Sequence, residues 1–326
     1  MKKVLFIPIG FYDYDNKIEQ EIQNLGYHVT RFTPIGNYGP VQKLYNAFTK
    51  GEYLKKKCLI RQKEALLNTT EKYDYVFVIV GRQLDPVVLK EFREKQRDAK
   101  FVLYLWDDIE RVEGYHENRE CYDEIYSFDL RDVEKYGESH GVKHLPLFFT
   151  DAHEYHGEEK KYVLNLSGLL HSERLEIWDK IVKDNHLNVK ECYLYLMGAK
   201  INHFVQAILP GGNQWMNLKY IHVNGMPFSK MAENSKASKV ALDVQFGTQA
   251  GLTMRTLESL GANTKLITTN EFVKKYDFYQ YGNIHVIDRK NPVVPQEFFD
   301  TDYNKISEEI VNKYSLKNWV KTMLGE

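Results

Sequence analysis

The segment 241–261, ALDVQFGTQAGLTMRTLESLG, carries the residues whose types and spacing point most directly to chemistry. An apolar run ends at Gln245, a glycine-containing loop follows, and a helix is expected to begin near Thr253 with Arg255 in its first turn. Free amides at a helix N-terminus, together with a guanidinium, bind a diphosphate well. Glu258, one turn later, is placed to accept hydrogen bonds from a ribose diol. The pattern favours a nucleotide site; a simple turn followed by solvated helix charges is the alternative.

Two other expected strands are followed by carboxylates. Asp13 lies in the loop 10–15 (GFYDYD) after the first strand, and Asp107 follows an apolar run that ends at Trp106. A positioned carboxylate can act as a general base toward a substrate hydroxyl. Asp13 is our first choice for that role and Asp107 the second. For each, a helix N-cap or a carboxylate bonded to loop amides is the alternative interpretation.

Length and charge limit the classes of protein to consider. The chain has 326 residues, and its 44 Lys and Arg nearly balance its 45 Asp and Glu, giving a net charge of −1. Nucleic acid binding needs a concentrated basic surface, so no nucleic acid partner is expected. The three cysteines form no CxxC pair, which indicates a reducing compartment without a zinc site. The apolar run at the start reads as a strand rather than a signal peptide, and no run of about 18 apolar residues occurs, so we expect a cytoplasmic protein.

Short apolar runs alternate with amphipathic stretches along the whole chain, as in parallel α/β sheets. In the first half, strands are expected at 4–9, 27–32, 75–80, 101–106, 124–128 and 142–146, and residues 41–70 are expected to be helical. After a polar stretch, strands are expected at 162–167, 191–197, 240–244, 265–268 and 283–287. We therefore predict an α/β fold of two doubly wound domains, 1–150 and 151–326. The final helix needs an apolar surface, and packing back on the first domain would supply one.

Several of these segments resemble bacterial GT-B glycosyltransferases of the spore-maturation, capsular and lipopolysaccharide biosynthesis type. The most specific are LDVQ at 242–245, GLTMRTLESLGA at 251–262 and KLITTN at 265–270; LWDD at 105–108, YDEIYSFD at 122–129, LPLFF at 145–149 and LSGLLHSER at 166–174 agree. The resemblance covers nearly the whole chain. It implies two Rossmann-like domains facing across a cleft, with a nucleotide-sugar donor on the C-terminal domain and a sugar acceptor on the N-terminal domain.

The resemblance also assigns roles to individual residues. Glu258 matches the carboxylate that binds the ribose in these enzymes, and Arg255 belongs to the segment that binds the diphosphate. Arg174 matches the basic residue that contacts the same phosphates. The donor-binding residues expected on this basis are Gly168, Arg174, Gln245, Gly251, Leu252, Thr253, Arg255, Glu258 and Asn270.

The resemblance bears on the mechanism as well. Retaining members space two glutamates eight apart, but position 250 is Ala here, so we prefer inversion of the anomeric configuration. Inversion needs a base, for which Asp13 and Asp107 are the candidates. Amides and guanidinium groups would hold the leaving diphosphate, so we expect no obligatory metal and no cofactor. The pair Asp13 and Asp15 also matches the metal-binding pair of the other large glycosyltransferase fold, but its place after the first strand argues against that interpretation.

These inferences predict a glycosyltransferase that moves a sugar from a nucleotide-diphospho-sugar to a glycan or lipid-linked glycan in surface polysaccharide biosynthesis. Two alternatives stay open: a nucleotide-sugar epimerase of the same architecture, and a nucleotide-binding module without chemistry. Two histidine pairs, His140 with His144 and His153 with His156, have a spacing that a metal can use. No carboxylate or cysteine is spaced to complete a metal site with these histidines, so we interpret them as surface histidines.

The segment 43–67 combines basic and apolar residues in the half assigned to the acceptor. If the acceptor is lipid-linked, this stretch would give the protein a peripheral contact with the anionic inner face of the membrane. A solvated helix face whose apolar residues belong to the core is the alternative, because Glu52 and Glu64 dilute the positive charge.

Overall fold

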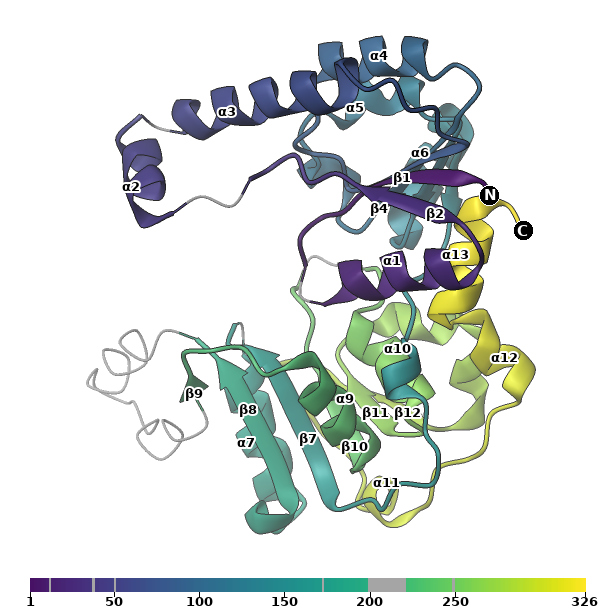
Figure 1. Cartoon of the computed structure of the whole chain (residues 1–326). Coiled ribbons are helices and arrows are strands. Elements are labelled where there is room, and N and C mark those ends of the chain that lie inside the picture. Colours follow the sequence, from purple (N-terminus) through teal and green to yellow (C-terminus); the bar gives the residue numbers. More distant parts are fainter. Residues whose placement is uncertain (12, 37–38, 50, 172, 199–220, 248–249) are drawn as a thin grey trace. The chain divides into compact units, whose positions relative to one another are not determined.

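The computed structural model (Figure 1) describes the chain except for residues 12, 37–38, 50, 172, 199–220 and 248–249 and the side chains of 40, 41, 43 and 44. The described residues form two compact units. Unit 1 contains Met1–Pro146 together with Lys317–Glu326, and unit 2 contains Leu147–Leu316. The acceptor and donor roles assigned to the two halves remain predictions.

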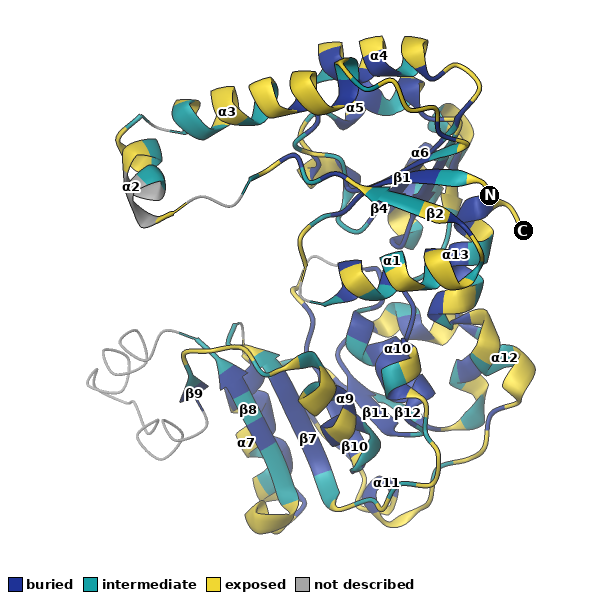
Figure 2. Cartoon of the chain, viewed as in Figure 1, coloured by how far each residue is buried: buried dark blue, intermediate teal, exposed yellow. Residues whose placement is uncertain are grey.

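Unit 1 is built on a six-stranded parallel sheet of order β2-β1-β3-β4-β5-β6. Its strands are β1 (Lys3–Ile7), β2 (His28–Arg31), β3 (Tyr75–Ile79), β4 (Lys100–Leu105), β5 (Glu124–Ser127) and β6 (Val142–His144). Its helices are α1 (Tyr14–Asn24), α2 (Pro40–Phe48), α3 (Glu52–Gln62), η1 (Lys63–Leu67), α4 (Pro86–Lys95), η2 (Ile109–Arg111), α5 (Tyr115–Asn118), η3 (Arg119–Cys121), α6 (Leu130–His140) and α13 (Leu316–Leu324). The central strands are almost wholly apolar because helices cover both faces of the sheet (Figure 2).

The last helix, α13, belongs to the core of unit 1. Trp319 is 2% exposed, and its ring lies 4.7 Å from that of Tyr104 and 5.6 Å from that of Phe77. These two aromatic residues come from the central strands β4 and β3. The apolar residues at the end of the chain therefore pack against the sheet of unit 1.

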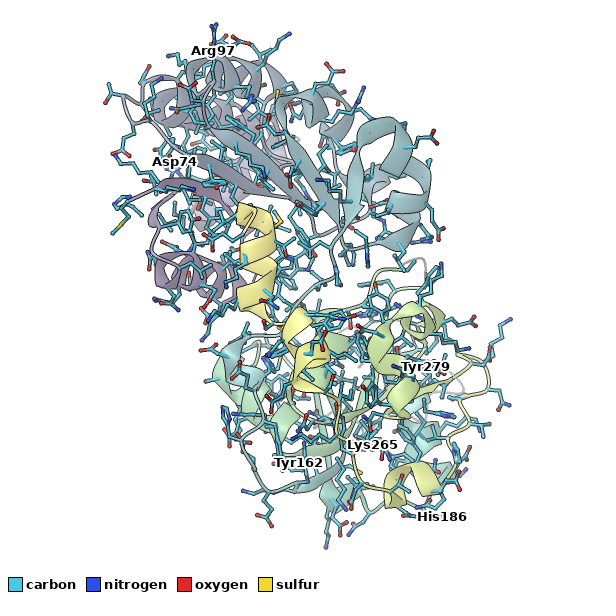
Figure 3. All side chains as sticks on the ribbon, turned by 90° about the vertical axis from the view of Figure 1, so that its right-hand side faces the viewer. Asp74, Arg97, Tyr162, His186, Lys265 and Tyr279 are labelled. Atoms are coloured by element: carbon cyan, nitrogen blue, oxygen red, sulfur yellow. The ribbon has the colours of Figure 1, made fainter. Side chains whose placement is uncertain are left out.

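Unit 2 repeats the architecture with a second six-stranded parallel sheet, of order β12-β11-β10-β7-β8-β9. Its strands are β7 (Tyr162–Leu169), β8 (Cys192–Met197), β9 (Ile221–His222), β10 (Ser238–Asp243), β11 (Lys265–Thr268) and β12 (Ile284–Val286). Its helices are η4 (Asp151–His153), α7 (Arg174–Asp184), η5 (Val189–Glu191), α9 (Phe228–Lys236), α10 (Met254–Gly261), η7 (Glu271–Lys275), η8 (Asp277–Tyr281), α11 (Glu297–Asp300) and α12 (Glu308–Lys313). Figure 3 labels Tyr162 and Lys265, which begin β7 and β11 at the amino edge of this sheet.

The predicted α/β fold of two doubly wound parallel sheets is confirmed. One prediction needs correction: residues 41–70 are not one continuous helical stretch. The chain turns at Gly51, whose φ of +93° is in the left-handed region that favours glycine, and α3 starts after it. Among the described residues, no helix has both the length and the apolar character needed to cross a membrane.

Candidate functional site

The strand order of unit 2 reverses between β7 and β10. From β7 the chain moves outward through β8 and β9, then returns to the other side of β7 with β10 and continues to β11 and β12. Open parallel sheets bind ligands at such a switch point, beyond the carboxyl ends of the strands. The segment singled out from the sequence, at 241–261, begins in β10 and continues past the carboxyl end of that strand, so it lies at this point.

Two arginines from different helices reach the carboxyl end of β7. Arg174, the first residue of α7, is buried and donates from Nε to the carbonyl of Val244 (2.9 Å) and from Nη1 to the carbonyl of Leu169 (2.8 Å). Arg255, in the first turn of α10, donates from Nη2 to the carbonyl of Ser167. Backbone carbonyls orient these guanidinium groups without cancelling their charge.

Gly168 makes room for both groups. A Cβ atom at this position would lie 2.9 Å from Nη1 of Arg174 and 3.4 Å from Nη2 of Arg255. Any other residue would therefore push the guanidinium groups away from the end of β7. Gly168, expected at the donor site, thus acts by allowing the two arginines to approach the strand.

A third arginine joins this site, and sequence reasoning missed it. Arg289 follows β12; its Nη2 donates to the carbonyl of Gln245, and its Nη1 lies 3.1 Å from the carboxylate of Glu173. The only signal in the sequence was a basic residue shortly after an expected strand. Because β12 is the far edge strand, nothing in the sequence linked Arg289 to the end of β10.

An aromatic pair borders the arginines. The rings of His171 and Phe246 stack with centroids 3.9 Å apart, and Phe246 is 47% exposed. Burial, followed by the positive charges of Arg174 and Arg289, lowers the pKa of His171 to about 4. The imidazole is therefore neutral at pH 7, and the local potential is positive.

Helix α10 begins at this site with a well-formed N-terminus. Thr253 is its N-cap residue, and the Thr253 hydroxyl accepts from the amide of Thr256 (3.4 Å) while it donates to Oδ2 of Asp243 (2.8 Å). This cap ties the helix start to the end of β10. The macrodipole and free amides of α10 consequently add to the positive potential of the arginines.

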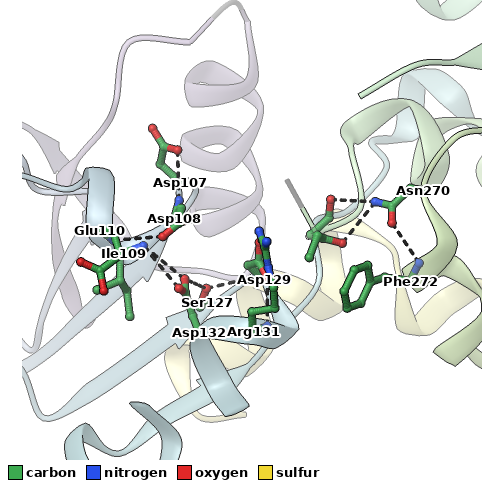
Figure 4. Close-up of polar contacts among 12 residues, drawn as sticks. Asp107, Asp108, Ile109, Glu110, Ser127, Asp129, Arg131, Asp132, Asn270 and Phe272 are labelled. Atoms are coloured by element: carbon green, nitrogen blue, oxygen red, sulfur yellow. Dashed lines mark hydrogen bonds and ion pairs between the residues drawn. The ribbon is translucent and has the colours of Figure 1, made fainter. Parts of the chain in front are cut away.

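Two further predicted donor-site residues shape the loop before α10. The side-chain amide of Asn270, which Figure 4 labels, donates to the carbonyls of Ala250 (3.2 Å) and Gly251 (3.1 Å). The side chain of Gln245 accepts from the hydroxyl of Thr269 (2.8 Å). Both side chains are buried, so their observed contacts hold the loop. Leu252 is also buried, at 1% exposure.

The carboxylate of Glu258, predicted to bind the ribose, is buried in unit 2. It is 3% exposed, and its Oε1 is 3.4 Å from Nε2 of His153, which is fully buried. Nδ1 of His153 lies 3.2 Å from the hydroxyl of Thr150. The interpretation of His153 as a surface histidine is therefore wrong. Its polar neighbours in the sequence are exposed, while the imidazole itself packs under α10 in contact with Phe228.

His153 should make the stability of the protein pH-dependent. Burial lowers its pKa below the ordinary 6.5, outweighing the nearby carboxylates of Glu258 and Asp151, while the cations Lys236 and Arg255 lower it further. Below about pH 6.5 the unfolded chain therefore takes up a proton that the folded chain does not, and stability falls. We expect the Tm to drop more between about pH 7.5 and pH 5.5 in the natural chain than in His153→Gln.

Thermal unfolding followed by circular dichroism measures this difference. His156→Gln is the matched control, because His156 is exposed and should leave the pH slope unchanged. Equal slopes for the natural chain and His153→Gln would contradict the assignment.

In unit 1, the predicted bases follow β1 and β4, which flank β3 in the sheet. Asp13 is the N-cap residue of α1, but its side chain makes no cap bond to the described backbone; its Oδ1 accepts from the side-chain amide of Asn16 (2.7 Å). Asp107 is partly exposed, and its Oδ2 lies 2.8 Å from Nη2 of Arg82. Asp15, by contrast, is buried and accepts from the amide of Gly10 (2.7 Å), as expected of a loop-organising carboxylate.

A buried carboxylate that sequence reasoning missed supports the Asp107 loop. Asp132 accepts from the hydroxyl of Ser127 (2.7 Å) and from the amide of Ile109 (3.4 Å), as Figure 4 shows. Burial, reinforced by the negative charges of Asp129 and Asp108, raises the pKa of Asp132 to about 6. Its contacts anchor Ile109 in the turn that follows β4, two residues after Asp107.

Unit 1 also has a groove large enough for a ligand. It has a volume of about 820 Å³ and lies between α3 and the segment that follows β3; its polar lining includes Lys55, Lys56, Gln62, Arg82 and Glu117. Ligand pockets usually span about 300–1,000 Å³. A smaller crevice beside it reaches the ends of β1 and β3, where the strand order of this sheet reverses.

Comparison with known proteins yields structural neighbours but no sequence relatives. No family model and no curated protein matches the sequence. A glycosyltransferase from Rickettsia africae ESF-5 has a TM-score of 0.61 at 12% identity, covering 99% of this chain and 97% of its own. AviGT4, a glycosyltransferase involved in avilamycin A biosynthesis, has a TM-score of 0.61 at 10% identity, and the match covers 100% of this chain and 96% of AviGT4.

A third neighbour has a different activity. The UDP-GlcNAc 2-epimerase from Methanocaldococcus jannaschii has a TM-score of 0.56 at 10% identity, covering 100% of both chains. At such low identities, the likeness shows that this chain has the fold of GT-B enzymes and leaves its reaction open.

Proposed function

We propose that the protein is a glycosyltransferase that moves a sugar from a nucleotide-diphospho-sugar to a glycan or lipid-linked glycan acceptor in surface polysaccharide biosynthesis. The observation that carries the proposal is the convergence of Arg174, Arg255 and Arg289 at the switch point of unit 2. Guanidinium groups beside a helix N-terminus suit a diphosphate. Two glycosyltransferases share the fold, so the proposed reaction is compatible with it.

The proposed reaction joins an acceptor hydroxyl to the anomeric carbon of the donor sugar. The hydroxyl oxygen attacks that carbon while a carboxylate, Asp13 or Asp107, takes the hydroxyl proton. The bond from the anomeric carbon to the phosphate oxygen breaks, and its electron pair leaves with the nucleotide diphosphate. Arg174, Arg255 and the amides at the start of α10 stabilise that growing negative charge. A direct displacement of this kind inverts the anomeric configuration.

The epimerase alternative is favoured by one observation, the likeness of the fold to UDP-GlcNAc 2-epimerase. An epimerase would use the same nucleotide site but would need acid and base groups at the sugar itself, and the residues assigned above do not supply them. A nucleotide-binding module without chemistry would need only the arginines. The three functions differ in product, so one assay separates them.

Incubation with UDP-, GDP-, CDP- and dTDP-sugars tests the proposal. We expect one donor class to be consumed by transfer or slow hydrolysis, with release of the nucleotide diphosphate measured by chromatography. Because guanidinium groups and amides hold the leaving group, the activity should persist in EDTA. Formation of an epimer would favour the alternative enzyme, and binding without turnover the module. Loss of activity in EDTA with recovery in manganese would revive a metal site at Asp13 and Asp15.

We also propose that α2 and α3 bring unit 1 to the anionic inner face of the membrane. Phe48 is 85% exposed and Tyr45 53%, while Lys55, Lys56 and Lys57 are exposed on the following helix. Exposed apolar side chains beside cations are typical of interfacial helices. Lys43 and Lys50, also part of the predicted contact segment 43–67, lie outside the described side chains.

Sedimentation with anionic vesicles measures this contact. Each cation near the surface contributes about 1 kcal/mol, so changing Lys55, Lys56 and Lys57 to Glu should abolish binding at low salt. Phe48→Ala should weaken it. Arg97→Glu is the control, because the Arg97 side chain is 77% exposed and belongs to the segment after α4. Absence of binding by the natural chain at low salt would reject the membrane contact.

A further inference from the structure

A small cavity lies inside unit 2, beside α10. It has a volume of about 10 Å³, and its lining includes Thr256 and Ser259 of α10, Tyr303 from the segment before α12, and the apolar side chains of Phe278 and Ile306. A single buried water needs about 10–15 Å³ on this scale. The cavity is thus large enough for one water and too small for a larger ligand.

Three hydroxyl groups in the lining have no hydrogen-bond partner among the described residues: those of Thr256, Ser259 and Tyr303. Thr256 and Ser259 are 2% and 3% exposed, so bulk water does not reach them. Helical Ser and Thr hydroxyls often bond to a carbonyl one turn earlier, but neither of these does. An unpaired buried hydroxyl is destabilising, and three around one cavity need a common explanation.

The other polar side chains of the lining are already satisfied. The hydroxyl of Thr264 donates toward the carbonyl of Ser235 (2.8 Å), and the side-chain amide of Asn283 donates to the carbonyl of Asn304 (2.7 Å). Neither is therefore left to pair with the three hydroxyls.

We propose that the cavity holds one ordered water molecule, bound by the hydroxyl groups of Thr256, Ser259 and Tyr303. A buried water typically makes about three hydrogen bonds, which matches the number of groups that lack a partner. Each hydroxyl can donate or accept, so the water's two protons and its lone pairs can all be used.

The water would support the helix that carries the arginine site. Thr256 and Ser259 are three residues apart and share one face of α10, and Arg255 and Glu258 share the neighbouring face. A bridge from Thr256 and Ser259 to Tyr303 would fix the helix from the face beside the one that carries Arg255 and Glu258. The inference does not depend on which nucleotide, if any, the arginines bind.

Whether removing one hydroxyl lowers or raises the stability of the fold tests the proposal. Tyr303→Phe and Thr256→Val each remove a hydroxyl with little change in volume. With water bound, each should lower the folding equilibrium constant by about 5- to 100-fold, since the remaining hydroxyls and the water lose a partner. In a dry cavity each would raise it, because an unpaired buried polar group disappears. Denaturation in urea gives the constant, and Tyr45→Phe, at an exposed tyrosine, is the control.

Two further measurements sharpen the result. If the hydroxyls share one water, the double variant should lose less stability than the two single losses combined. A crystal structure at about 1.5 Å should show one density peak within hydrogen-bond distance of all three hydroxyls. Stabilised single variants, independent losses, an empty cavity, or hydroxyls bonded directly to one another would each overturn the proposal.

Discussion

Arg174→Ala is expected to lower the turnover number of sugar transfer by about 100-fold, and to change the Michaelis constant much less. Arg174 is buried at the switch point and held by the carbonyls of Val244 and Leu169, so its charge is fixed before any donor arrives. The charge on a leaving diphosphate grows during the reaction. A cation that is already oriented toward this growing charge stabilises the transition state more than it stabilises the bound donor.

Steady-state kinetics with the preferred donor measures both constants. Lys180→Ala is the matched control on the same helix, because Lys180 is partly exposed and pairs with Asp184 one turn away. Arg174→Lys keeps the charge but loses the forked geometry, and it should recover part of the activity. Since Arg174 also bonds two carbonyls, the Tm of each variant should be recorded. A folded Arg174→Ala variant with full turnover would remove Arg174 from the site.

Much of the site could be predicted because it lies on short contiguous motifs. Arg174 and Arg255 each stand close after an apolar run, and such runs identify strands in both halves of the chain. The carboxyl ends of parallel strands share one edge of a sheet, so residues that follow strands become candidates together. The strand-and-helix pattern was enough to single out Arg255, whereas Arg174 was assigned from the resemblance to GT-B glycosyltransferases.

Arg289 and His153 could not be predicted in the same way, because their contacts depend on strand order and burial. Arg289 meets Gln245 only because the loop after β12 reaches back to β10 across the sheet. His153 has polar sequence neighbours, yet it is buried against Glu258. Asn270 stays a predicted donor-binding residue; in the structure its side chain is buried and donates to the carbonyl of Gly251 in the loop before α10. Pattern alone does not report which side of a loop a side chain faces.

Glu258→Ala should weaken binding of UDP, if UDP is the nucleotide, by about 1.5–3 kcal/mol, which is roughly 10- to 150-fold. The reason is the loss of a charged acceptor for the ribose hydroxyls. Inorganic pyrophosphate has no ribose, so its affinity for the arginine site should stay unchanged. Calorimetry with both ligands separates a ribose contact from a general weakening of the site.

The burial of Glu258 makes this comparison necessary, because its carboxylate lies 3.4 Å from His153 and is only 3% exposed. If Glu258 serves only to hold α10 against η4, its loss should weaken both ligands together and lower the Tm. If it also reaches the ribose, the affinity for UDP should fall selectively. Glu258→Gln keeps the shape but loses the charge, and it should give a smaller, still selective loss. Equal loss of UDP and pyrophosphate affinity, or no loss of either, would rule out the ribose role and leave Glu258 as a structural partner of His153.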